Sequence, residues 1–158
     1  MMTTSMELAA SGVVLVVDDT EDNLIFVTHS LRRAGIHCLT ASRGWQCLEI
    51  ARNRRVDLIL LDLLMPQMDG WTTLAELRRD PAIRDIPVIM FSCDDRLVVR
   101  ERAMKESAVD FLPRPVMGDT LLACVKTHLQ AVARARALDV FDRDLESTLS
   151  RAAGSCGP

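Results

Sequence analysis

The 158-residue chain has little of what marks several large classes of protein. It has no tyrosine, only 4% aromatic residues and a net charge of −3, so neither base stacking nor a basic surface indicates nucleic-acid binding. No apolar run approaches the roughly 20 residues that span a bilayer. No basic residue precedes an apolar stretch at the N-terminus, as it would in a secretory signal. We therefore expect a cytoplasmic protein that contacts neither nucleic acid nor membrane directly.

The cysteines do not form the pattern of a disulfide framework or a zinc site. There are five, an odd number, and no two are spaced as C-x-x-C. Reduced thiols in a cytosolic protein are the simplest interpretation. The three histidines, His29, His37 and His128, are scattered, and we expect structural or surface roles for them.

What the chain does have is 49% hydrophobic residues, gathered in runs of strand length. Strong runs occupy 13–17, 58–61 and 87–91, and weaker ones occupy 36–40 and 109–112. Continuous apolar runs are typical of parallel strands buried on both faces of a sheet.

Helical patterns separate these runs. They cover residues 21–34, 45–53, 71–79, 96–106 and a segment that begins near 118. In the first, one side is expected to carry Leu24, Ile25, Val27, His29 and Leu31. Five alternations of strand and helix predict a doubly wound α/β fold, in which functional groups lie at the carboxyl ends of the strands.

Polar side chains follow the strong strands. Asp18 and Asp19 come after the first, Asp62 after the third and Ser92 after the fourth. Parallel strands would bring these groups to one edge, where three carboxylates repel each other unless a cation is present. Hard oxygen ligands of this kind suit Mg²⁺. The alternative is that each aspartate is only a turn residue or a helix N-cap.

Four motifs resemble those of one known family. They are VLVVDD at 14–19, LLDLLMPQMDG at 60–70, IPVIMFS at 86–92 and DFLPRP at 110–115. In order and spacing they resemble the receiver domains of two-component response regulators, over about residues 12–130. The resemblance implies a flavodoxin-like, five-stranded parallel sheet with strand order 2-1-3-4-5.

The resemblance also implies roles for the acidic residues. Asp62 would be the phosphoacceptor, taking a phosphoryl group from a histidine kinase or a phosphotransfer protein. Mg²⁺ would be held by Asp18, Asp19, Asp62 and the backbone carbonyl of Leu64. Such a protein is a signalling switch rather than an enzyme acting on a separate substrate.

The remaining site residues match the family less uniformly. Ser92 would bond a phosphoryl oxygen and move on activation, and Phe111 stands where an aromatic switch residue is expected. Arg114 replaces the lysine of the family motif. Its longer, forked side chain would either meet the phosphate from a different point or form a salt bridge to the acidic cluster. In the turn after the third strand, Gly70 is expected to supply a positive φ.

The C-terminal segment predicts a long helix, because neither glycine nor proline occurs from 119 to 153. We expect a disordered N-terminus at 1–11, a receiver domain at 12–130, a helical extension at 131–153 and a disordered tail at 154–158. Apolar residues recur at helical spacing in the extension: Leu138, Phe141, Leu145 and Leu149. Such a stripe needs a partner, which could be a second copy, a sensor kinase or a downstream output domain, unless the segment folds back or frays.

Two alternatives to a phosphorylated receiver stay open. The first is a degenerate receiver-like interaction module that is not phosphorylated, with Arg114 neutralising the acidic cluster. The second is a phosphatase-like hydrolase that uses the same aspartate. The hydrolase lacks a recognisable second acid two residues after Asp62, because Leu64 stands there.

Overall fold

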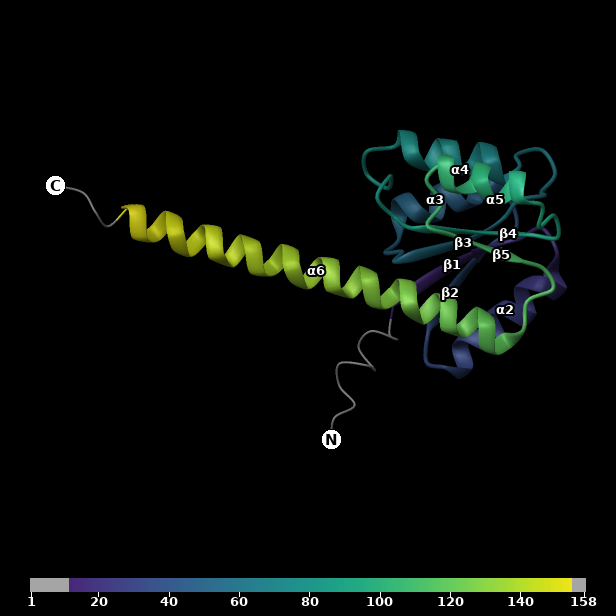
Figure 1. Cartoon of the computed structure of the whole chain (residues 1–158), viewed down its shortest axis with the longest axis horizontal. Coiled ribbons are helices and arrows are strands. Elements are labelled where there is room, and N and C mark those ends of the chain that lie inside the picture. The colour runs from purple at the N-terminus through teal and green to yellow at the C-terminus, as the bar shows by residue number, and fades with distance from the viewer. Residues whose placement is uncertain (1–11, 155–158) are drawn as a thin grey trace.

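The computed structural model describes residues 12–154, which build a five-stranded sheet between two layers of helices, with one helix projecting from the domain (Figure 1). The elements, in chain order, are β1 (Val13–Val17), α2 (Glu21–Arg33), β2 (His37–Ala41), α3 (Gly44–Asn53), β3 (Leu58–Asp62), α4 (Gly70–Arg79), β4 (Val88–Ser92), α5 (Leu97–Lys105), β5 (Asp110–Pro113) and α6 (Gly118–Gly154). The segments expected to be disordered, 1–11 and 154–158, lie outside the described residues except for Gly154.

The sheet has the expected topology. Its strand order is β2-β1-β3-β4-β5, and every neighbouring pair is parallel. The doubly wound α/β fold predicted from the alternating pattern is therefore confirmed. Each observed strand begins and ends within one residue of the expected run.

Apolar side chains on the two faces of the sheet form two cores. In β1, Leu15 and Val17 pack with α3, α4 and α5, whereas Val14 and Val16 pack with α2 and α6. The alternation follows from the two-residue period of a strand. Because both faces of the sheet are covered by helices, apolar residues are needed at every position of the central strands, which explains their uninterrupted apolar runs.

The inward side of α2 differs from the expected one. Ile25 and His29 were expected on the buried side, but both are exposed. Thr28 is buried instead, where its hydroxyl donates to the Leu24 carbonyl oxygen at 2.7 Å. The sequence pattern missed this because a threonine that bonds its own helix needs no other partner when buried.

The turn between β3 and α4 also corrects an expectation. Gly70 does not have a positive φ; that conformation falls on Gln67, with φ 67°. Gly70 is instead a point of close approach, since a Cβ there would lie 2.4 Å from the Asp62 carbonyl oxygen and 2.7 Å from the Cα of Leu63. The Gly70 N–H donates to the Leu63 carbonyl oxygen at 2.9 Å, which closes α4 onto the end of β3.

Helix α6 has 37 residues, about 55 Å at 1.5 Å per residue. Its first turns pack on the sheet through Leu121, Val125 and Leu129, and the rest extends away as a continuous helix (Figure 1). The sequence left open that the extension folds back on the domain; in the structure it does not fold back. Among residues 12–154, no helix is long and apolar enough to cross a membrane.

Candidate functional site

Strand register brings the polar residues together at one edge of the sheet. Val17 pairs with Leu61, so Asp18 and Asp62 lie beside each other just past that pair. Asp62 pairs with Phe91, one residue before Ser92, and Ser92 pairs with Pro113, one residue before Arg114. Four segments far apart in sequence therefore meet at the carboxyl ends of β1, β3, β4 and β5.

Three carboxylates form the centre of this edge, which we call the acidic cluster: Asp18, Asp19 and Asp62. One oxygen from each lies within 4.8 Å of the others. Asp18 and Asp62 are buried, and Asp19 is exposed. Burial and the neighbouring Asp18 carboxylate raise the pKa of Asp62 to about 7, although Arg114 and the Leu64 N–H act to lower it. The cluster therefore holds negative charge that its surroundings do not fully compensate.

Among the described residues, Arg114 is the cation that forms an ion pair with this cluster. Its guanidinium donates to Asp18 Oδ2, and its side chain is only 15% exposed. The guanidinium carbon also lies 5.0 Å from the centroid of the Phe91 ring. The other Asp18 oxygen accepts from the Thr20 N–H at 2.9 Å. A bridge from Arg114 to the acidic cluster, one of the sequence-based expectations, is thus present, and Asp18 is its partner.

The donor set fits a hard divalent cation. Three carboxylate oxygens at this separation match the oxygen-rich coordination of Mg²⁺, which commonly keeps several waters. The exposed Asp19 leaves one side open for those waters. Arg114 is a competitor, because its bond to Asp18 occupies an oxygen that a metal would use.

The other expected site residues lie around this cluster in different ways. The Ser92 side chain is buried, and its Oγ accepts from the Asp94 N–H at 3.0 Å. Phe111 is buried against the core, with the Arg100 guanidinium 5.2 Å from its ring centroid. Leu64 is 65% exposed, and its N–H donates to Asp62 Oδ1 at 3.4 Å. The Leu64 side chain thus stands at the open mouth of the site.

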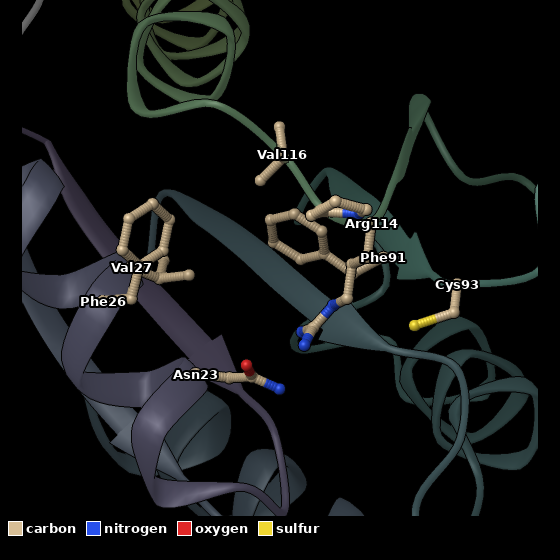
Figure 2. Close-up of a pocket in the computed structure, with 8 residues that line it drawn as sticks. Asn23, Phe26, Val27, Phe91, Cys93, Arg114 and Val116 are labelled. Carbon is tan, nitrogen blue, oxygen red and sulfur yellow. The ribbon is translucent and has the colours of Figure 1, made fainter.

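A pocket of about 380 Å³ adjoins Arg114 and was not expected from the sequence. Figure 2 shows Arg114 reaching from the segment after β5 toward Asn23 on α2, with Phe91 beside it. The lining is mostly apolar: Asn23, Phe26, Val27, Phe91, Cys93, Arg114, Pro115 and Val116. The only sequence signal for it is Phe26, an aromatic residue on the side of α2 that the helical pattern leaves outside the core.

Comparison with protein families gives one match over most of the chain. Residues 14–126 match the model of the response regulator receiver domain. The matched range contains the three aspartates of the acidic cluster together with Ser92 and Arg114.

Individual relatives agree with this match. The chain is 34% identical to a probable cyclic di-GMP phosphodiesterase of Vibrio cholerae over 80% of its own length, and 36% identical to the response regulator PleD of Caulobacter vibrioides over 74%. It spans only 28% and 26% of those two proteins. Protein PilH of Pseudomonas aeruginosa, of which it spans 96%, is 29% identical over 73% of the chain.

Solved structures show the same fold. The chemotaxis response regulator CheY4 of Vibrio cholerae superposes with a TM-score of 0.71 at 27% identity, over 75% of this chain and 98% of that one. NtrX of Brucella abortus gives a TM-score of 0.76 at 25% identity, over 83% of this chain and 29% of that one.

Proposed function

This chain belongs to the response regulator receiver domain family of two-component signalling, and from that membership we propose that it accepts a phosphoryl group on Asp62 in a magnesium-dependent reaction. The observation that carries the proposal is the acidic cluster at the carboxyl edge of the sheet. The cytoplasmic location expected from the sequence belongs to the same proposal.

In the proposed reaction, an Asp62 oxygen attacks the phosphorus of a phosphohistidine on a histidine kinase or a phosphotransfer protein. The new P–O bond forms as the P–N bond breaks, and the imidazole leaves. Transfer of this kind depends on positioning and on neutralising the phosphoryl oxygens. Asp18, Asp19, Asp62 and the Leu64 carbonyl would hold Mg²⁺, which supplies charge neutralisation when bound.

Two other side chains would act on the phosphoryl oxygens. The Ser92 hydroxyl would exchange its contact with the Asp94 N–H for a hydrogen bond to a phosphoryl oxygen. Arg114 would turn from Asp18 to the phosphoryl group, and its fork can bind two oxygens at once. Phe111, on the strand that leads to Arg114, would change its packing in response and so pass the change to a protein partner.

The test is phosphorylation with radiolabelled acetyl phosphate, a small-molecule phosphodonor. Wild type should take up base-labile label when Mg²⁺ is present and lose that uptake in excess chelator. Asp62→Asn should abolish labelling, because it removes the nucleophilic oxygen. Asp95→Asn, at an exposed aspartate in the loop before α5, is the matched control and should label normally. Equal labelling of wild type and Asp62→Asn would refute Asp62 as the phosphoacceptor.

A degenerate receiver that signals only by protein contacts is the second candidate. The Arg114–Asp18 pair favours it, because an internal cation already neutralises part of the acidic cluster. In that case neither wild type nor Asp95→Asn would label, whereas exchange of Arg114 for lysine would restore labelling. The phosphatase-like alternative has no support at position 64, where an exposed leucine stands.

For the extension of α6 we propose association with a second copy of the chain. The residues of its apolar stripe, Leu138, Phe141, Leu145 and Leu149, are all exposed. A downstream output domain is the alternative partner, since the Vibrio cholerae phosphodiesterase and PleD both extend well beyond the matched region.

A further inference from the structure

A second group of metal-ligand side chains lies where β5 packs against α6. His128 Nε2 is 2.9 Å from Asp110 Oδ2, and Cys124 Sγ is 3.4 Å from the same oxygen. One ligand atom from each of the three lies within 4.8 Å of the others. Asp110 is the first residue of β5 and Arg114 follows its last, so this group and the acidic cluster occupy opposite ends of the strand.

The fold holds all three side chains in place before any ligand binds. Cys124 and His128 are four residues apart on α6 and so share a face of the helix. Cys124 directly precedes the buried Val125, and His128 directly precedes the buried Leu129. The packing of these two apolar residues fixes the rotation of α6 against the sheet. The Phe111 N–H donates to Asp110 Oδ1 at 2.8 Å, which leaves Oδ2 directed at the other two ligands.

The donor types select a particular class of metal. A thiolate, an imidazole nitrogen and a carboxylate oxygen suit Zn²⁺, whereas Mg²⁺ prefers oxygen alone. Ligands of a tetrahedral zinc ion are separated by about 3–4 Å, given bonds of about 2.0–2.3 Å. All three residues are only half-buried, so water has access to a fourth position.

We propose that Asp110, Cys124 and His128 bind Zn²⁺, with water as the fourth ligand. The bound ion would link the N-terminal part of α6 to β5. On binding, the Cys124 thiol releases its proton to solvent. The His128 ring exchanges its Nε2 proton with solvent and carries its remaining proton on Nδ1, so that Nε2 binds the metal as a neutral imidazole nitrogen. Asp110 binds through Oδ2, which gives up its present hydrogen bonds to the other two side chains. This site is independent of the phosphorylation proposed for Asp62.

Cobalt is the probe, because a Co²⁺–thiolate bond absorbs in the near ultraviolet and tetrahedral Co²⁺ has intense visible bands. The titration uses the full chain with saturating Mg²⁺, which fills the acidic cluster, and Zn²⁺ then displaces the cobalt. Wild type should develop both signals at one equivalent. Cys124→Ser should abolish the thiolate band, and His128→Gln should lower the cobalt association constant by about 100-fold or more, beyond the 10–100-fold typical of losing an outer partner.

Cys93→Ser is the control, because it removes an exposed thiol outside the group and should leave both signals unchanged. Circular dichroism establishes that each variant is folded, and zinc should raise the Tm of wild type but not of Cys124→Ser. Absence of the thiolate band in wild type would overturn the proposal. So would a band that survives Cys124→Ser or disappears in Cys93→Ser.

Discussion

At the scale of single residues, the acidic cluster places Asp62 where its charge is costly. The carboxylate is buried beside Asp18, and only one cation, Arg114, lowers its pKa. In the unfolded chain the same group titrates near its ordinary value of 3.8. The folded state therefore keeps this proton to a higher pH than the unfolded state does.

The first prediction concerns the pH dependence of stability in metal-free protein. Between about 4 and about 7 the unfolded chain loses the Asp62 proton while the folded chain retains it, so this residue lowers the free energy of unfolding as pH rises. Above about pH 7 both states have lost the proton, and the free energy of unfolding falls no further on account of Asp62. Asp62→Asn should remove this decline, making the variant more stable than wild type at pH 8 but not at pH 4.

Denaturant unfolding of both proteins in excess chelator, from pH 4 to pH 8, measures the difference. The wild-type titration alone is not diagnostic, because other carboxylates also change their charge over this range. A difference between the two proteins that does not grow with pH would show that the burial of Asp62 does not impose the expected cost.

Arg114 carries the second prediction at this scale. Its pairing with Asp18 must loosen before the side chain reaches a phosphoryl group, whereas its fork can then hold two phosphoryl oxygens. Phosphorylation should accordingly be slower and longer-lasting in wild type than in Arg114→Lys. Each rate should differ by about tenfold, which corresponds to about 1.4 kcal/mol in the barrier.

Uptake and decay of label at fixed Mg²⁺ measure both rates in one experiment. Arg79→Lys, at an exposed arginine of α4 that pairs with Glu76 rather than with the acidic cluster, is the matched control and should behave as wild type. Faster decay in wild type than in Arg114→Lys would contradict the idea that the fork retains the phosphoryl group.

At the scale of elements, the junction of β3 and α4 fixes the nucleophile. The Asp69 side chain caps α4 by accepting from the Thr72 N–H at 2.8 Å, and Gly70 packs directly on the backbone of Asp62 and Leu63. The distance between strand end and helix start is therefore set by the absence of a side chain at position 70.

The third prediction is that Gly70→Ala destabilises the fold. Its Cβ would overlap backbone atoms, which cannot rotate away as a side chain can, and overpacking of this kind costs about 1–3 kcal/mol. Gly118→Ala is the control, because it also begins a helix but meets only Ser30 Oγ at 3.9 Å. Urea unfolding of both variants should show a lowered midpoint only for Gly70→Ala, and equal midpoints would contradict the close approach.

The elements themselves were largely predictable from the sequence. Strands and helices begin and end close to their expected positions because uninterrupted apolar runs and helical periodicity are local signals. The meeting of Asp18 with Asp62 was predictable as well, since parallel strands end at one edge. The carboxylate with which Arg114 pairs was not predictable, because it depends on the conformation of the segment after β5.

Other features depend on packing that the pattern does not encode. The residue with positive φ in this turn is Gln67 and not Gly70. Glycine is required at position 70 because a Cβ there would overlap the backbone of Asp62 and Leu63. The proximity of Asp110, Cys124 and His128 could not be predicted, because the three side chains come from a strand and a helix and match none of the usual spacings of metal sites. The structural or surface role expected for His128 stays a prediction, which the cobalt titration tests.

At the scale of the whole molecule, an ion pair at the base of the sheet anchors the projecting part of α6. Arg136 Nη2 lies 2.5 Å from Oδ1 of Asp57, a buried residue just before β3, whose Oδ2 accepts from the Val13 N–H at 2.8 Å. Burial acts to raise the pKa of Asp57, but these partners outweigh it and lower the pKa. The extension is therefore supported by the domain up to Arg136, and beyond that residue its apolar stripe faces solvent.

The last prediction follows from that boundary. Leu138, Phe141, Leu145 and Leu149 are separated by three, four and four residues, a spacing typical of helices that associate side by side. Most helical stability in proteins comes from the packing of an apolar face, so pairing with a second copy would stabilise this segment by burying the stripe. The mass measured for the full chain by sedimentation equilibrium should approach twice 17.6 kDa as concentration rises.

Truncation after Ala137 keeps the Arg136–Asp57 pair and should give a monomer, as should replacement of the four stripe residues by glutamine. Arg143→Gln, an exposed change in the same segment, should leave association intact. A full chain that stays monomeric at high concentration would rule out the second copy, and the stripe would then have to serve another partner.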